Sequence, residues 1–177
     1  YLAVINGALP IGIGQEQWVT DLVTVTKGGM IAPNGQRTQV VPTSGMSEDE
    51  HSRISNLPYV VSATLAYTPL AIRSINKDTE RKQTAVHVKL ITGRKHQIRA
   101  QFAAMGHPVV GDARYGASQR FKERDIALHA YAIAFYHPVN RTSRTVVTSS
   151  ISNNNLWTSR FGAEFIDEVN ASLESVV

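Results

Sequence analysis

Alternating hydrophobic and polar positions along the chain predict a protein built mainly from β-strands. The most regular run is 84–91, in which two valines and a leucine share one face while His87 and Lys89 share the other. Similar runs predict further strands at 1–5, 22–26, 59–67 and 128–137. In the run 128–137, alanines at every second position predict close packing against a helix or a neighbouring strand.

Hydrophobic residues spaced three and four apart predict helices in two places. One helix would run from about Arg94 to Met105, and Gly106 would end it. The other lies within 160–175, where Phe161 and Phe165 begin a four-residue repeat. The stretch 27–58 is rich in Gly, Pro, Ser and Asn, which predicts long hairpin loops or an insertion. Strands outnumber helices, so we expect an α+β fold with a mainly antiparallel sheet.

Composition narrows the class of protein. A chain of 177 residues with 42% hydrophobic content can bury one core, so we expect one domain spanning 1–177. The chain has no cysteine, and the spacing of its histidines fits no common zinc or iron site. We therefore expect no metal and no cofactor. With no run of about 18 apolar residues, we expect no membrane association and an intracellular location, in the cytoplasm or the mitochondrion.

The basic residues gather in one segment of the chain. Between Arg81 and Gly111 there are six Lys and Arg and no Asp or Glu, although the net charge is only +4. A basic segment with interleaved histidines is typical of a nucleic-acid-binding surface. A solvated basic face would give the same pattern, so this alternative stays open.

Arg94 stands out within the basic segment. On a helix that starts there, Arg94 would share a face with Ile98 and Phe102 and so point into the core. A buried guanidinium is costly without a partner, so Arg94 should meet a carboxylate in a cleft. Lys95 and Arg99 would lie on another face, free to meet solvent or phosphate.

Several motifs resemble, in order, those of the RluA-type pseudouridine synthases. They are Tyr1-Leu2-Ala3-Val4-Ile5-Asn6-Gly7, Ala63-Thr64-Leu65-Ala66-Tyr67, Thr92-Gly93-Arg94-Lys95-His96-Gln97-Ile98-Arg99, Gly106-His107-Pro108-Val109-Val110-Gly111-Asp112, Tyr115-Gly116, Leu128-His129-Ala130 and His137-Pro138. The resemblance covers most of the chain except 27–58 and the tail after about 145.

This resemblance implies a mixed, mainly antiparallel sheet with an RNA-binding cleft, and isomerisation of uridine to pseudouridine without cofactor or metal. In that family an aspartate of a His-Arg-Leu-Asp motif attacks the nucleotide, an arginine pairs with it, and a tyrosine lies against the base. The arginine maps to Arg94 and the tyrosine to Tyr1. The expected partner is RNA, either rRNA or tRNA. The residues expected to contact RNA are Lys89, Lys95, His96, Arg99 and Tyr115, although Tyr115 could instead belong to the core.

The chain departs from the family at the nucleophile. None of the 177 residues forms a His-Arg-Leu-Asp motif. Asp112 matches a family aspartate that we interpret as a turn former. Either the catalytic aspartate lies upstream of Tyr1, or the protein binds RNA without catalysis, for example on a ribosomal assembly particle. A protein-interaction module that uses the acidic C-terminal helix is a further alternative.

Overall fold

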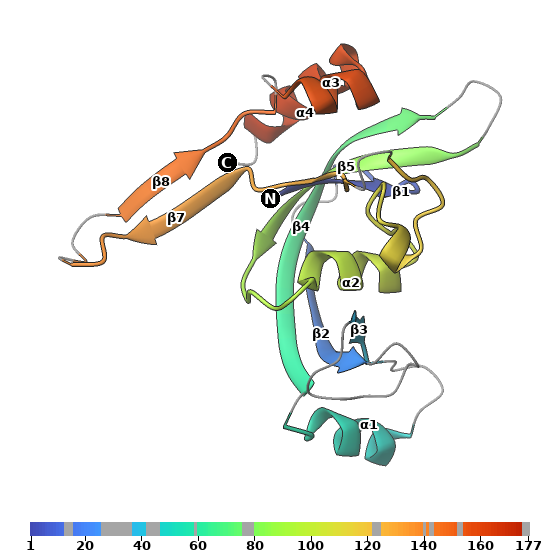
Figure 1. The fold of residues 1–177 in the computed structure, drawn as a ribbon, viewed down its shortest axis with the longest axis vertical. Helices are drawn as coiled ribbons and strands as arrows, with labels where there is room; N and C mark the ends of the chain where they lie inside the picture. Colours follow the sequence, from blue (N-terminus) through green and yellow to red (C-terminus); the bar gives the residue numbers. More distant parts are fainter. Residues whose placement is uncertain are drawn as a thin grey trace.

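Six strands form one antiparallel sheet at the centre of the protein. The computed structural model describes residues 1–12, 16–25, 37–41, 47–58, 60–75, 80–121, 125–139, 141, 144–151 and 154–174. The strand order is β3-β2-β4-β5-β1-β6, and every neighbouring pair is antiparallel (Figure 1). The strands are β1 (Leu2–Asn6), β2 (Glu16–Val25), β3 (Arg37–Val40), β4 (Val60–Ser74), β5 (Lys82–Leu90) and β6 (Leu128–His129). With four α-helices beside it, this sheet confirms the predicted α+β class.

The two longest pairings of the sheet place β4 between β2 and β5. The strand predicted at 59–67 continues to Ser74, past a bulge at which the register with β5 shifts between Pro69 and Ala71. Proline has no N–H to donate, so within a sheet it is found at edges and bulges. This explains why β4 tolerates Pro69 in its interior and bends instead of ending there.

Helices α2 (Gln97–Ala104) and α4 (Ala163–Glu174) flank the sheet, and α3 (Asn155–Phe161) leads into α4. The repeat predicted for the C-terminal helix is confirmed, because Phe165, Val169 and Leu173 are buried. The helix is interrupted at Gly162, whose φ of 84° is accessible to few other residues. Phe161 and Trp157 of α3 join the same core.

The segment predicted as loops at 27–58 contains regular structure, so that prediction needs correction. Strand β3 pairs with β2 from Arg37 to Val40, and α1 (Glu48–Ser55) follows. Ser47 caps α1: its side chain accepts from the Glu50 N–H, while the Glu50 carboxylate accepts from the Ser47 N–H. The remaining parts of this prediction, 27–36 and 42–46, lie outside the described residues.

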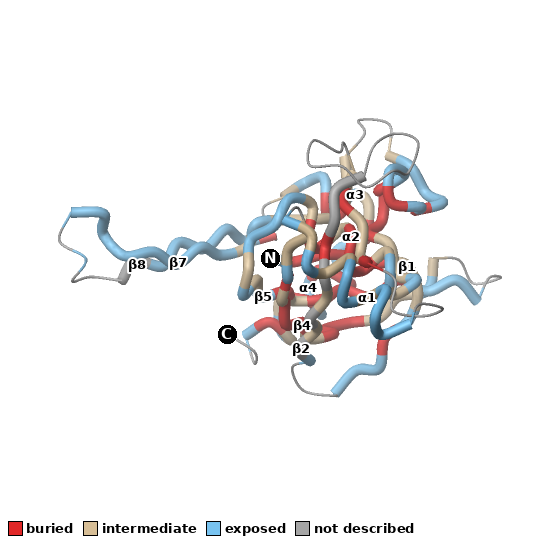
Figure 2. Tube along the Cα trace, turned by 90° about the horizontal axis from the view of Figure 1, so that it is seen from below, coloured by how far each residue is buried: buried red, intermediate tan, exposed pale blue. Residues whose placement is uncertain are grey.

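The single strand predicted at 128–137 is divided into two. Strand β6 joins the main sheet, while β7 (Ala132–Tyr136) pairs only with β8 (Arg144–Thr148) among the described residues, in a separate hairpin. This hairpin extends away from the body and is exposed along its length (Figure 2). The prediction that its alanines pack closely is therefore wrong.

His87 of β5 makes the stability of the fold depend on pH. Burial is the main cause that lowers the pKa of His87 to about 4, and the positive charge of Lys89 acts in the same direction. Between about pH 4 and the unfolded pKa near 6.5, the unfolded chain binds a proton that the folded chain does not. Stability contributed by neutral His87 is thus present above about pH 6.5 and lost as the pH falls to about 4.

We expect the variant His87→Gln to lose stability less steeply between pH 6.5 and pH 4 than the unmodified protein does. Urea unfolding at several pH values measures this slope. The same substitution at exposed His137 is the control. An unchanged slope in His87→Gln would contradict the assignment.

Candidate functional site

The turn that joins β5 to α2 carries the basic motif. The side chain of Gln97 is buried, and its oxygen accepts hydrogen bonds from the Thr92 hydroxyl and the Arg94 N–H, both at 3.0 Å. The Thr92 oxygen in turn accepts from the N–H of Thr64 on β4 at 2.8 Å. These bonds fix residues 92–97 as a turn, so the helix begins at Gln97 and not at Arg94.

Because Arg94 precedes the helix, the predicted inward orientation of Arg94 is wrong. Its side chain is exposed, and its Nε donates to the backbone oxygen of Ser62 at 3.2 Å. No carboxylate pairs with Arg94 in the part of the chain that the structure describes. The predicted core face itself is confirmed, since Ile98 and Phe102 are buried.

The inward-facing arginine is Arg99. Its Nε and Nη2 donate to the two carboxylate oxygens of Asp112 at 2.6 and 2.8 Å, and this carboxylate is 1% exposed. The hydrogen bond to Asp112 raises the pKa of Arg99. The prediction that Arg99 is free to meet solvent or phosphate is thus corrected. The Nε and Nη2 groups of its guanidinium already donate to Asp112. Asp112 is a charged partner in addition to a turn residue.

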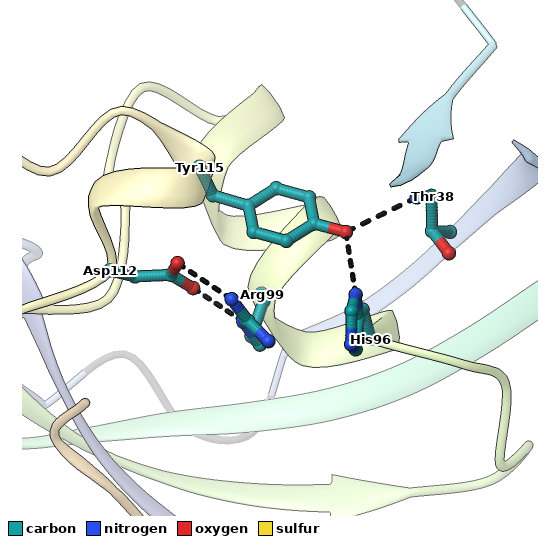
Figure 3. A network of polar contacts seen from close by, with 5 residues as sticks. All are labelled: Thr38, His96, Arg99, Asp112 and Tyr115. Atoms are coloured by element: carbon teal, nitrogen blue, oxygen red, sulfur yellow. Dashed lines mark hydrogen bonds and ion pairs between the residues drawn. The ribbon is translucent and has the colours of Figure 1, made fainter. Parts of the chain in front are cut away.

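Tyr115 connects the Arg99–Asp112 ion pair to His96, the residue just before α2 (Figure 3). The Arg99 guanidinium carbon lies 4.9 Å from the centre of the Tyr115 ring, and the Arg37 guanidinium carbon lies 5.2 Å from it. The Tyr115 hydroxyl accepts from the Thr38 N–H at 3.2 Å and lies 3.0 Å from His96 Nδ1. At 4% exposure, the ring has no open face for a base. The core interpretation of Tyr115 holds, and its predicted RNA contact needs correction.

His96 is held in an unusual backbone conformation at the same place. Its φ of 53° and ψ of 23° are left-handed, which is uncommon for residues other than glycine and often marks functional positions. Burial and then Arg99, Arg114 and Lys95 lower the pKa of His96. A larger fraction of the His96 imidazole is therefore neutral at pH 7 than in an ordinary histidine. Its contribution at this place is hydrogen bonding and not positive charge.

A cavity of about 210 Å³ opens beside the turn, and we call it the turn pocket. Its lining includes Tyr1, Arg94, His96, Gln97, Arg99 and Leu128. Tyr1 is brought there from the start of the chain, because its carbonyl accepts from the N–H of Val88 at 2.8 Å. Both residues that the motif resemblance mapped to the catalytic site thus line one pocket. Lys89 and Lys95 are exposed but do not line it.

Sequence reasoning missed Gln97 as the residue that shapes the turn. A buried glutamine in an otherwise basic run was an available signal, because buried amides must find hydrogen-bond partners. Among the described residues, no three His, Asp or Glu side chains gather as a metal site would need. No helix in that part of the chain is both long and apolar enough to span a bilayer.

Comparison with known proteins finds sequences similar to this chain among RNA pseudouridine synthases. No protein-family model matches the chain. A dual-specificity RNA pseudouridine synthase RluA of Vibrio parahaemolyticus is 43% identical over 67 residues, which are 37% of this chain and 26% of the relative. An uncharacterized RNA pseudouridine synthase of Bacillus subtilis, YjbO, is 30% identical over 105 residues, which are 51% of this chain and 37% of the relative. The chain thus spans about a quarter to a third of the length of these relatives.

Solved structures agree on the fold. Human RNA pseudouridylate synthase domain containing 1 matches with a TM-score of 0.56 and 21% identity, over 84% of this chain and 52% of that one. Human RNA pseudouridylate synthase domain containing 4 matches with a TM-score of 0.54 and 16% identity, over 96% of this chain and 60% of that one. The chain is therefore similar to RluA-type RNA pseudouridine synthases in the matched part of its sequence, and it has the fold of pseudouridylate synthase domains.

Proposed function

We propose that this chain belongs to an RNA pseudouridine synthase and holds the target uridine in the turn pocket. The observation that carries the proposal is that Tyr1 and Arg94, which are distant in sequence, line the same cavity. The cavity is smaller than the roughly 300–1,000 Å³ of typical ligand sites, so it suits one nucleotide component and not a whole oligonucleotide. Tyr1 would lie against the base, as the family resemblance implies.

Arg94 is the partner proposed for the catalytic aspartate. Its Nε is engaged with Ser62, while its two terminal amino groups make no ion pair with a described carboxylate. These groups suit a carboxylate that comes from outside the 177 residues, because guanidinium and carboxylate pair in a planar, two-bond geometry. Held this way, the aspartate would stay ionised and aimed at the nucleotide. The exposed cations Lys89 and Lys95 would contact phosphates, and the RNA would be rRNA or tRNA inside the cell.

The test measures conversion of uridine to pseudouridine in structured RNA by the natural protein that contains these residues. We expect Arg94→Ala to lower turnover by about 100-fold or more, the usual loss when one stabilising charge is removed from an active site. RNA affinity should change little. Normal turnover in Arg94→Ala would overturn the assignment.

Lys95→Ala is the matched control, because it removes the neighbouring cation outside the pocket. We expect it to weaken RNA binding and to reduce the salt dependence by about one unit of slope. Turnover of saturating RNA should stay unchanged. This difference separates a residue that serves the reaction from one that serves binding.

The second candidate is an RNA-binding protein without catalysis, which could act on a ribosomal assembly particle. The observation that favours it is the lack of a His-Arg-Leu-Asp motif in the 177 residues. Reading the codons that precede Tyr1 separates the two candidates. A His-Arg-Leu-Asp motif there supports catalysis, whereas another residue in place of the aspartate supports the binding protein.

A further inference from the structure

A second cavity, of about 450 Å³, adjoins the turn pocket, and we call it the side pocket. The two cavities share Arg99 and Leu128 in their walls, so they lie next to each other. The side pocket adds Asp125 from the segment before β6, Asn154 and Leu156 from the start of α3, and Arg160 from its last turn. Nothing in the proposed reaction uses these four residues.

The polar wall of the side pocket carries both a positive and a negative side chain. Arg160 Nη2 lies 3.1 Å from Asp125 Oδ2, and the Arg160 guanidinium carbon lies 4.2 Å from the centre of the Phe121 ring. The Asn154 side-chain oxygen accepts from the N–H groups of Leu156 and Trp157. Its amide nitrogen is therefore the part of the side chain left to donate. A phosphate would face the Asp125 carboxylate here. A neutral group with both donors and acceptors suits this wall better.

The side pocket also has apolar residues in its lining. Leu156 lines the pocket and is 51% exposed, and Ile126 and Trp157 also line it. An exposed leucine can pack against the flat face of a base while nearby hydrogen-bonding groups contact the edge of that base. Proteins recognise single-stranded RNA through such contacts.

We propose that the side pocket binds the base of the nucleotide adjacent to the target uridine, and that it prefers a base with an exocyclic amino group. The inference rests on the proposed function, which it deepens by naming a second part of the substrate. The Asp125 carboxylate accepts from an amino group of adenine, cytosine or guanine, and uracil has none to offer. Asp125 therefore discriminates against uracil beside the target.

Arg99 lies where the two nucleotides would be joined. Two of its N–H groups are used by Asp112, while Nη1 takes no part in those bonds. A phosphate that links a base in the turn pocket to one in the side pocket would pass this shared wall. The pair with Asp112 thus orients Arg99 toward the backbone of the substrate.

The experiment measures binding of fluorescent RNA hairpins whose loop holds one target uridine, with each nucleotide beside it varied among the four bases and no uridine elsewhere in the loop. We expect the unmodified protein to bind a loop with uridine neighbours on both sides about 5- to 30-fold more weakly than a loop with an amino-bearing neighbour. Leu156→Ala should weaken binding of the preferred loop about 5-fold or more, as loss of one base-packing contact does. Asp125→Asn should reduce the discrimination against uridine.

Ile133→Ala is the matched control, since Ile133 is an exposed aliphatic residue of the distant hairpin. It should leave both affinity and preference unchanged. If the unmodified protein binds none of the hairpins, the proposed function fails and the inference fails with it. If it binds them while neighbour identity, Leu156→Ala and Asp125→Asn all have no effect, the side pocket is overturned and the proposed function stands.

Discussion

Asp112→Asn is expected to destabilise the protein by about 3 kcal/mol. The substitution keeps the shape of the side chain but removes the charge that meets Arg99 at 2.6 and 2.8 Å. An asparagine amide also presents N–H groups to a guanidinium that can only donate. Breaking a buried pair costs about 3–5 kcal/mol, and the lower end applies because the Arg99 side chain is still 18% exposed. Urea unfolding followed by tryptophan fluorescence measures the change.

The same substitution at Asp125 is the matched control. Asp125 pairs with Arg160 at 3.1 Å, but its side chain is 43% exposed. Exposed pairs contribute about 0–1 kcal/mol, so Asp125→Asn should leave the free energy of unfolding almost unchanged. Equal losses in the two variants would show that burial does not distinguish these pairs.

A double variant separates the charge from the shape. Arg99→Met alone leaves the Asp112 carboxylate buried and unpaired, which should cost at least as much as Asp112→Asn. Combining the two removes both charges, and an apolar side chain of similar volume then lies against the amide. We expect the double variant to be more stable than the sum of the single losses predicts.

The position of the paired arginine shows where sequence reasoning succeeded and where it did not. The apolar face formed by Ile98 and Phe102 was correctly inferred. The arginine that pairs with a carboxylate was expected at Arg94, but it is Arg99. The helix start was placed at Arg94, three residues before its position at Gln97. Helix boundaries depend on which group takes the free N–H groups. Here Gln97 takes the N–H of Arg94, a contact that periodicity does not encode.

Two other differences have separate physical causes. The capping box Ser47-Glu48-Asp49-Glu50 was readable, but the whole stretch 27–58 was interpreted as loops or an insertion, so α1 was missed. The strand 128–137 was predicted to pack closely on its alanine face. Alternation in sequence indicates a strand with two different faces, but it does not show what covers each face. In the structure both sides of β7 face solvent.

Gly111→Ala is expected to be as damaging as the loss of Asp112, for a steric reason. Gly111 has a φ of 87°, and a Cβ added there would lie 2.6 Å from the backbone oxygen of Asp125 and 2.6 Å from Phe121 Cδ2. The left-handed backbone costs about 1–2 kcal/mol for any residue with a Cβ. Overpacking against backbone adds about 1–3 kcal/mol, so we expect a total near 3 kcal/mol.

Gly116→Ala separates these two contributions. Gly116 has nearly the same φ, 93°, but nothing lies within 4 Å of an added Cβ. Its substitution should therefore cost only the backbone part, about 1–2 kcal/mol. The difference between the two variants in urea unfolding measures the collision at Gly111 alone. Since the displaced groups belong to Phe121 and Asp125, which hold Arg160 in the side pocket, Gly111→Ala should also weaken any preference for the neighbouring base. A variant as stable as Gly116→Ala would mean that Phe121 and the Asp125 backbone move aside without cost, and the collision expected at Gly111 would be wrong.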